Sequence, residues 1–416
     1  MRRAWMIVPL LAAAASAALA QSPPRPKLPA SADTNDADAY LAWGKSKLQK
    51  SPADAAAAFY WATRLEPGRA GAYYGRWVAL QLADPSRFTA HYERKKSALE
   101  SPAVQAIDSI QLRALELGPL DYRDLDGMLV GIVYRPSGTT STRERLGTFG
   151  GSVSGIDSMP LPGSTMPSAG TGAVYRQPGG PSAPTISYST GSAWDEYAHG
   201  NFSRALLDYA GTLPGSKAKW AIYAERGRVF AITKSPDSAL AQLALAIADV
   251  PKDSAHAETY VYESVALYEH TRGLVHEMQK HADSARAAYQ RALDADPAYA
   301  PAQLRLAALD LAKGDTAAAI SHYDLAAQIR ANDGLLAYEY GYLLIKSGHD
   351  AEALEQLERA AKLEPYFAAP RFLAAAVYDA HDMKPQASAD YTAFLSLASK
   401  ADPLVARAKD RLSTLQ

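Results

Sequence analysis

Residues 335–365 read LLAYEYGYLLIKSGHDAEALEQLERAAKLEP, and this stretch decides the fold. Its first half is largely apolar and stops at Gly348, shortly after a lysine, as helices commonly end. Its second half, residues 351–363, places apolar residues at helical spacing and is closed by Pro365. The stretch therefore predicts two consecutive helices joined by a short turn.

The same unit occurs four times at a constant spacing, equal to the separation between Gly273 and Ala307. Two places in it hold small residues, and a third holds a large one in most copies. The small places are Gly273, Ala307, Gly341 and Ala375, then Ala285, Ala319, Ala353 and Ala387; the large place is Tyr289, Tyr323, Leu357 and Tyr391. A fixed period of this kind predicts a solenoid, in which each helical pair buries one face on the next pair.

The pattern resembles the tetratricopeptide repeat (TPR), whose motif is W-x2-L-G-x2-Y, then A-x3-F, then P within a period of about 34 residues. In the copy quoted above, these places are held by Tyr340-Gly341, Leu344, Ala353, Leu357 and Pro365. Two further copies contain Gly227, Ala239, Leu243, Ala246 and Pro251, and Gly44, Ala55, Phe59, Ala62 and Pro67. The resemblance implies an all-α solenoid of TPR-type helix-turn-helix units in two blocks, with a role in binding other proteins.

Composition divides the chain further. From about residue 134 to 190, Gly, Ser, Thr and Pro dominate, and such segments bury too little apolar surface to fold. We therefore predict five segments: a signal peptide at 1–20, an N-terminal TPR-like helical block at 35–117, a largely disordered linker at 118–190, the TPR solenoid at 191–399 and a C-terminal capping helix at 400–416. The linker is either a spacer, or a segment that orders on a partner or folds back into the chain's own groove.

The first twenty residues have the features of a secretory signal. Arg2 and Arg3 precede a short apolar stretch, and Ala18-Leu19-Ala20 is typical of a cleavage site. We expect a periplasmic or secreted protein with no membrane span after cleavage, the alternative being retention of the signal as an anchor. The chain has no cysteine, which excludes a lipid-anchored lipoprotein and disulfide bonds.

The sequence argues against an enzyme. The net charge is −1 without a basic stripe, so nucleic-acid binding is disfavoured. His276 and His281 are five positions apart, whereas zinc-binding helices place two histidines four apart, and no phosphate-binding glycine loop is present. We expect no enzyme, no cofactor and no metal site; an enzyme with its site in residues 118–190 is a less favoured alternative.

In TPR proteins, the first helix of each pair lines a concave groove that binds peptides. Carried over to this sequence, the resemblance predicts a mixed aromatic and charged groove, and for each of its residues packing between repeats is the alternative. The predicted partner-binding residues are Arg228, His270, Glu277, Tyr338, Tyr342, Lys346, Phe372 and Asp379. We expect a scaffold or adaptor for an unidentified protein or peptide in the cell envelope. The alternative is an architectural component that self-associates into a homo-oligomer.

Overall fold

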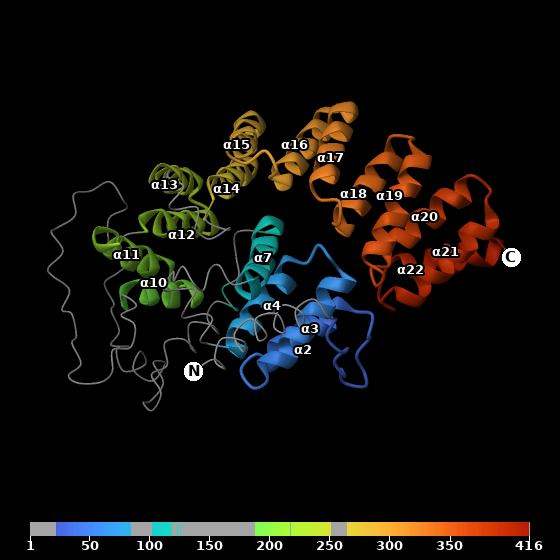
Figure 1. Cartoon of the computed structure of the whole chain (residues 1–416), viewed down its shortest axis with the longest axis horizontal. Helices are drawn as coiled ribbons and strands as arrows, with labels where there is room; N and C mark the ends of the chain where they lie inside the picture. The colour runs from blue at the N-terminus through green and yellow to red at the C-terminus, as the bar shows by residue number, and fades with distance from the viewer. Residues whose placement is uncertain are drawn as a thin grey trace, which may run out of the picture.

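The computed structural model describes residues 22–84, 102–118, 123, 125, 188–216, 218–250 and 264–415. All regular structure within these ranges is helical (Figure 1). The predicted signal peptide and most of the predicted linker lie outside the described residues. Among the helices that are described, none is long and apolar enough to cross a membrane.

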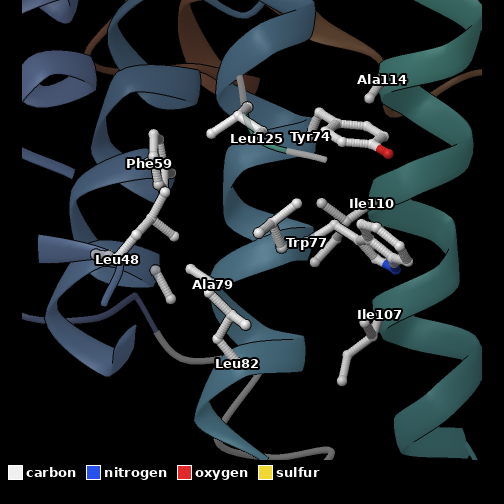
Figure 2. Packing of buried hydrophobic residues seen from close by; sticks show 13 residues of the cluster. Leu48, Phe59, Tyr74, Trp77, Ala79, Leu82, Ile107, Ile110, Ala114 and Leu125 are labelled. Carbon is white, nitrogen blue, oxygen red and sulfur yellow. The ribbon is translucent and has the colours of Figure 1, made fainter. Parts of the chain in front are cut away.

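The N-terminal block contains four described helices, which pack on one apolar core. They are α2 (Ala37–Lys47), α3 (Pro52–Leu65), α4 (Ala70–Ala83) and α7 (Pro102–Leu117). Figure 2 shows that α7 turns Ile107, Ile110 and Ala114 toward Tyr74 and Trp77 of α4. Leu125, which lies within the predicted linker range, is also buried in this core. Ordered structure in the N-terminal block therefore extends past residue 117.

The second block is an arch of stacked helical pairs (Figure 1). In chain order its elements are α10 (Tyr188–Ala198), α11 (Phe202–Thr212), the short 3-10 turn η2 (Leu213–Gly215), α12 (Lys219–Ile232), α13 (Pro236–Asp249), α14 (Val265–Met278), α15 (Ala282–Ala295), α16 (Ala300–Lys313), α17 (Thr316–Ile329), α18 (Gly334–Lys346), α19 (Asp350–Leu363), α20 (Ala369–Ala380), α21 (Lys384–Leu397) and α22 (Leu404–Leu415). The expected all-α solenoid in two blocks is confirmed.

The turn inside each pair is set by one residue with left-handed backbone. This conformation recurs at Gly200, Lys234, Lys280, Gly314, Gly348 and Asp382. The last four follow one another at the constant spacing of the sequence repeat, so the turn keeps its register even where the residue is not glycine. Three of the six are non-glycine residues, for which left-handed backbone is unfavourable. The stacking of the pairs therefore holds these turns in shape against local preference.

The small residues of the period allow the two helices of a pair to approach closely. A Cβ atom added at Gly273 would lie 2.2 Å from Cε1 of Tyr289, and one added at Gly341 would lie 2.9 Å from Cγ of Leu357. Both pairs join the small place in the first helix to the large place in the second. The period seen in the sequence is therefore a packing period.

The arch closes on a capping helix. Ala408 of α22 is fully buried, and Leu404, Leu412 and Leu415 pack on the cluster around Phe372. These four residues form the apolar stripe of α22.

The two blocks are in contact, which the sequence did not predict. The N-terminal helices lie inside the curve of the arch, with α7 beneath its centre (Figure 1). Trp194 of α10 packs on the N-terminal core at one end of the arch, and Asn35 Nδ2 donates to the Ser396 carbonyl at the other end (3.1 Å). The N-terminal block therefore spans the concave side.

Candidate binding surface on the concave face

Helix α7 presents three side chains to the arch. Arg113 pairs with Asp333 (2.9 Å), and Glu116 accepts a hydrogen bond from Arg330. Leu115 packs on the apolar cluster that contains Leu267, Tyr299 and Ala302. The Glu116 side chain is 4% exposed, so this salt bridge is largely shielded from water. Arg330 and Asp333 flank the turn between α17 and α18, so the two ion pairs form one charged cluster at that turn, while Leu115 supplies a separate apolar contact with α14 and α16.

A second contact joins the end of α3 to the end of α19. Arg64 pairs with Glu364 (2.5 Å) and donates to the Leu363 carbonyl (3.2 Å). Side-chain exposures of 27% and 12% place the ion pair partly out of water. Here, too, the arginine belongs to the N-terminal block and the carboxylate to the arch.

The extended segment before α2 forms a third contact. The guanidinium carbon of Arg25 lies 5.7 Å, 4.9 Å and 5.7 Å from the ring centroids of Tyr40, Trp61 and Tyr366. These distances are in the range of cation–π attraction. Trp61 also donates its indole N–H to the Pro23 carbonyl (3.0 Å). Tyr366 belongs to the arch, so this exposed arginine contacts rings from both blocks.

The same segment is fixed to the far end of the arch. Asp33 Oδ2 accepts hydrogen bonds from the Lys400 backbone N–H (2.6 Å) and the Ser399 hydroxyl (3.2 Å). The backbone donors and Ser399 lower the pKa of Asp33, although its burial acts in the opposite direction. Because the charged form accepts these bonds, Asp33 is an anionic anchor between the blocks.

Carboxylates gather where the blocks meet. Burial raises the pKa of Glu339 to about 7, and nearby Asp333 adds to the effect while Arg113 opposes it. Burial likewise raises the pKa of Glu364 to about 7, against the effect of Arg64. On the opposing side, burial lowers the pKa of Arg76. At these sites, partly desolvated acidic groups of the arch face arginines of the N-terminal block, whereas Glu116 and Arg330 pair in the opposite sense.

One side-chain network occurs twice in the arch. The Tyr289 hydroxyl donates to Glu277 (2.6 Å), which Arg305 also contacts. Three repeats further on, the Tyr391 hydroxyl donates to Asp379 (3.2 Å), which Arg411 also contacts. Both networks join the first helix, the second helix and the element that follows. The chain has a TPR fold.

The fold assignment rests on this register and packing. No protein-family model matches the chain, and no curated protein shows significant sequence similarity to it. Solved TPR structures are similar only at low identity. The C-terminal part of a TPR repeat-containing protein from Cytophaga hutchinsonii is 17% identical (TM-score 0.42), covering 54% of this chain and 83% of that one. YrrB, described as a TPR protein with an unusual peptide-binding site, is 17% identical (TM-score 0.37; 49% and 98%). PilF of Pseudomonas aeruginosa is 16% identical (TM-score 0.40; 55% and 96%).

Four of the predicted TPR groove residues are engaged within the arch. His270 is 1% exposed between the rings of Tyr289 and Tyr299, and burial lowers its pKa to about 3. Phe372 is 4% exposed against Tyr391 and Phe394. Glu277 and Asp379 are the acidic members of the repeated network. All four therefore have contacts within the arch, and their role in binding a partner stays a prediction.

The other four predicted residues have different surroundings. Arg228 pairs with Glu225 and lies over the Tyr197 ring. Tyr338 is half-buried, edge-on to Phe367 at 4.9 Å between centroids. Tyr342 is 47% exposed, and Lys346 Nζ lies 5.5 Å from its ring centroid. A role of any of these residues in binding a partner stays a prediction.

The inner helices leave a partly open apolar strip. Its exposed members are Met278 of α14 (53%), Leu311 of α16 (40%) and Tyr342 of α18 (47%), with Lys346 beside Tyr342. These residues lie in the C-terminal halves of their helices, whereas Leu267 and Ala302, nearer the N-terminal ends, belong to the cluster on which α7 packs. The N-terminal block therefore covers one half of the TPR groove.

Sequence reasoning missed the residues that join the blocks. Arg64 and Arg113 are ordinary helix-surface arginines in the sequence, and their hydrogen-bond partners Leu363 and Asp333 lie 299 and 220 residues away. They are hard to identify from the sequence because an ion pair between distant segments produces no repeating pattern. Tyr366 follows the terminal proline of its repeat, a place for which the TPR motif specifies nothing.

Proposed function

We propose that this protein is a non-enzymatic scaffold whose concave TPR face binds a protein or peptide partner. The observation that carries the proposal is that this face already binds polypeptide: Arg113 and Glu116 of α7 pair with the turn between α17 and α18, and Leu115 packs on the cluster of α14 and α16. A surface that combines an apolar centre with charged flanks is typical of protein-binding sites.

The open half of the groove is the first place where a partner would bind. Met278, Leu311 and Tyr342 supply exposed apolar and aromatic surface, and Lys346 supplies one cation. Large aromatic side chains contribute much of the energy at protein interfaces. We assign Tyr342 as the main anchor, since it is the most exposed aromatic residue on the inner helices that the structure describes.

A photo-crosslinking residue at Tyr342 tests this role. The matched control carries the same residue at Leu245 on the outer helix α13, which is 45% exposed against 47% for Tyr342. With the full chain in envelope extract, we expect a discrete adduct from position 342 that is absent from position 245. Adding Leu311→Asp should reduce its yield. Equal adducts from both positions, or no effect of Leu311→Asp, would contradict a groove site.

The proposed location is the cell envelope, on the basis of the secretory features of residues 1–20. The test is cell fractionation of the full chain beside a variant in which Arg2 and Arg3 are changed to Glu. We expect the unaltered protein to be exported and the variant to be retained in the cytoplasm. Retention of both would remove the proposal of export.

Self-association is a second candidate function, favoured by the outer surface. Leu325 and Ile329 lie one turn apart on α17 and are 47% and 38% exposed. Paired exposed apolar residues of this kind are common where copies of a protein meet. Light scattering of the full chain, beside the Leu325→Lys, Ile329→Lys variant, separates an assembly that depends on this face from a monomeric scaffold.

A further inference from the structure

We propose that the half of the concave face covered by the N-terminal block is itself a docking surface for an amphipathic helix, and that α7 is its resident occupant. The partner helix would carry arginine, leucine and glutamate at the spacing of Arg113, Leu115 and Glu116, and would compete with α7. This inference rests on the proposed scaffold function and names the chemistry of a partner.

The two faces of α7 differ in kind. One face, with Ile107, Ile110 and Ala114, is fixed in the apolar core of its own block (Figure 2). The other meets the arch through two ion pairs, and Leu115 packs both on its own core and on the arch cluster. Contacts that are mostly ionic break at lower cost than a packed apolar core, because water and salt replace them. Release of the block breaks these ion pairs and also separates Leu115 from the arch cluster and Trp194 of α10 from the N-terminal core.

The arch presents a charge pattern that this helix matches. Asp333 faces Arg113, Arg330 faces Glu116, and the apolar cluster with Leu267 lies against Leu115. Arginine and glutamate three positions apart on a helix lie on the same face, so one amphipathic helix satisfies both charges at once. Binding of an amphipathic helix in a groove is a common mode of peptide recognition.

Release would expose partly buried carboxylates. Asp333 has 15% and Glu364 12% of the side chain exposed; release would leave Asp333 with Arg330 of the arch at 3.9 Å, whereas Glu364 would lose Arg64. An unpaired, partly buried carboxylate is unfavourable. The opened arch would therefore favour a partner that restores the arginine contacts over one that supplies apolar contact alone.

The first experiment measures whether the block leaves the arch. The chain has no cysteine, so spin labels at Lys50→Cys in the block and Glu355→Cys in the arch report one distance in the full protein. We expect a narrow distance distribution for the unaltered interface, a longer population for Arg64→Glu, Arg113→Glu, and a return to the narrow one for the exchanged pair Arg113→Asp, Asp333→Arg. A distribution that does not change with any variant would overturn release.

Should the charge-reversed variant lose helicity by circular dichroism, the labelled chain without interface changes decides the matter. Raising KCl from about 0.05 M to about 1 M screens ion pairs, so the longer population should grow. A constant distribution over that range, with helicity retained, would equally overturn release.

The second experiment uses a fluorescent peptide of residues 102–118 as the probe. It should bind the full-length Arg113→Asp chain, whose own α7 is weakly held, at least about tenfold more tightly than the unaltered chain, since a competing occupant lowers apparent affinity. The Asp333→Arg chain should prefer the Arg113→Asp peptide to the unaltered one. Equal binding of both peptides to every chain would overturn the assigned surface. This outcome is independent of adducts at Tyr342, so it leaves the scaffold function separately testable.

Discussion

Lys280 and Gly314 occupy the same turn in consecutive repeats, and both have left-handed backbone, with φ of 62° and 81°. The two turns thus compare a residue with a Cβ and one without in the same structural setting. Glycine adopts this conformation freely, whereas lysine does so at a cost of about 1 kcal/mol.

Lys280→Gly should therefore stabilise the protein, by about 0.5–1 kcal/mol, because it relieves the backbone strain at an exposed position. The reciprocal change, Gly314→Ala, should destabilise it by a similar amount. Thermal denaturation of both variants provides the measurement. Changes of the same sign in the two would contradict the assignment of these turns.

Gly273→Ala should be strongly destabilising, by about 2 kcal/mol or more, since overpacking a close helix contact forces side chains and backbone apart. The new Cβ would lie 2.2 Å from the Tyr289 ring. Gly71→Ala is the matched control, because a Cβ added at that helical position meets nothing within 4 Å. We expect the control to leave the melting temperature unchanged or slightly raised.

The buried carboxylates predict a pH dependence of stability. Glu339 and Glu364 have pKa values raised from 4.5 to about 7, so unfolding releases their protons between these two pH values. Their contribution to stability is full below pH 4.5 and is lost as the pH rises toward 7. Buried His270, with its pKa lowered to about 3, contributes in the opposite direction over part of this range.

The Glu339→Gln, Glu364→Gln variant isolates the carboxylates from His270. Glutamine keeps the shape of the neutral acid, and Asp333, Arg64 and Arg113, the charged groups around both sites, stay in place. We expect the melting temperature of the variant to gain on that of the unaltered chain as pH rises from 5 to 8. A constant difference between them would show that these groups ionise normally in the folded protein.

Arg25→Ala should loosen the contact between the blocks with little effect on either core. The guanidinium touches Tyr40 and Trp61 of its own block and Tyr366 of the arch, and a cation–π contact contributes about 0.5–2 kcal/mol. Limited proteolysis should cut the variant faster near residue 30. Lys27→Ala, two positions away, is the control, and equal cleavage of the two variants would argue against a stabilising contact between Arg25 and the rings.

The repeats were predictable because one local rule governs them. A small residue in the first helix must face a large one in the second, and Gly273 with Tyr289 meets that condition at the same spacing as Gly341 with Leu357. The fold class, the helix pairs and the capping helix α22 could therefore be predicted from the periodic spacing of apolar residues.

The binding surface was predicted less well, because the position of a residue in the repeat does not determine how exposed its side chain is. Position for position, Tyr338 and Phe372 are equivalent, yet one is half-buried and the other is closed in by Tyr391 and Phe394. The residues that bridge the blocks, such as Arg64 and Glu364, form pairs only once the chain is folded, and a single sequence holds no trace of that proximity.

The hydrogen bonds that Asp33 accepts from Ser399 and Lys400 have a consequence for how the chain folds during its synthesis. These partners are 366 and 367 residues further along the chain, so they are synthesised much later than Asp33. During synthesis, the segment around Asp33 cannot form these hydrogen bonds until the repeat that carries Ser399 has been made. An arch without the Ser399–Lys400 turn would leave Asp33 unattached and its segment open to proteases.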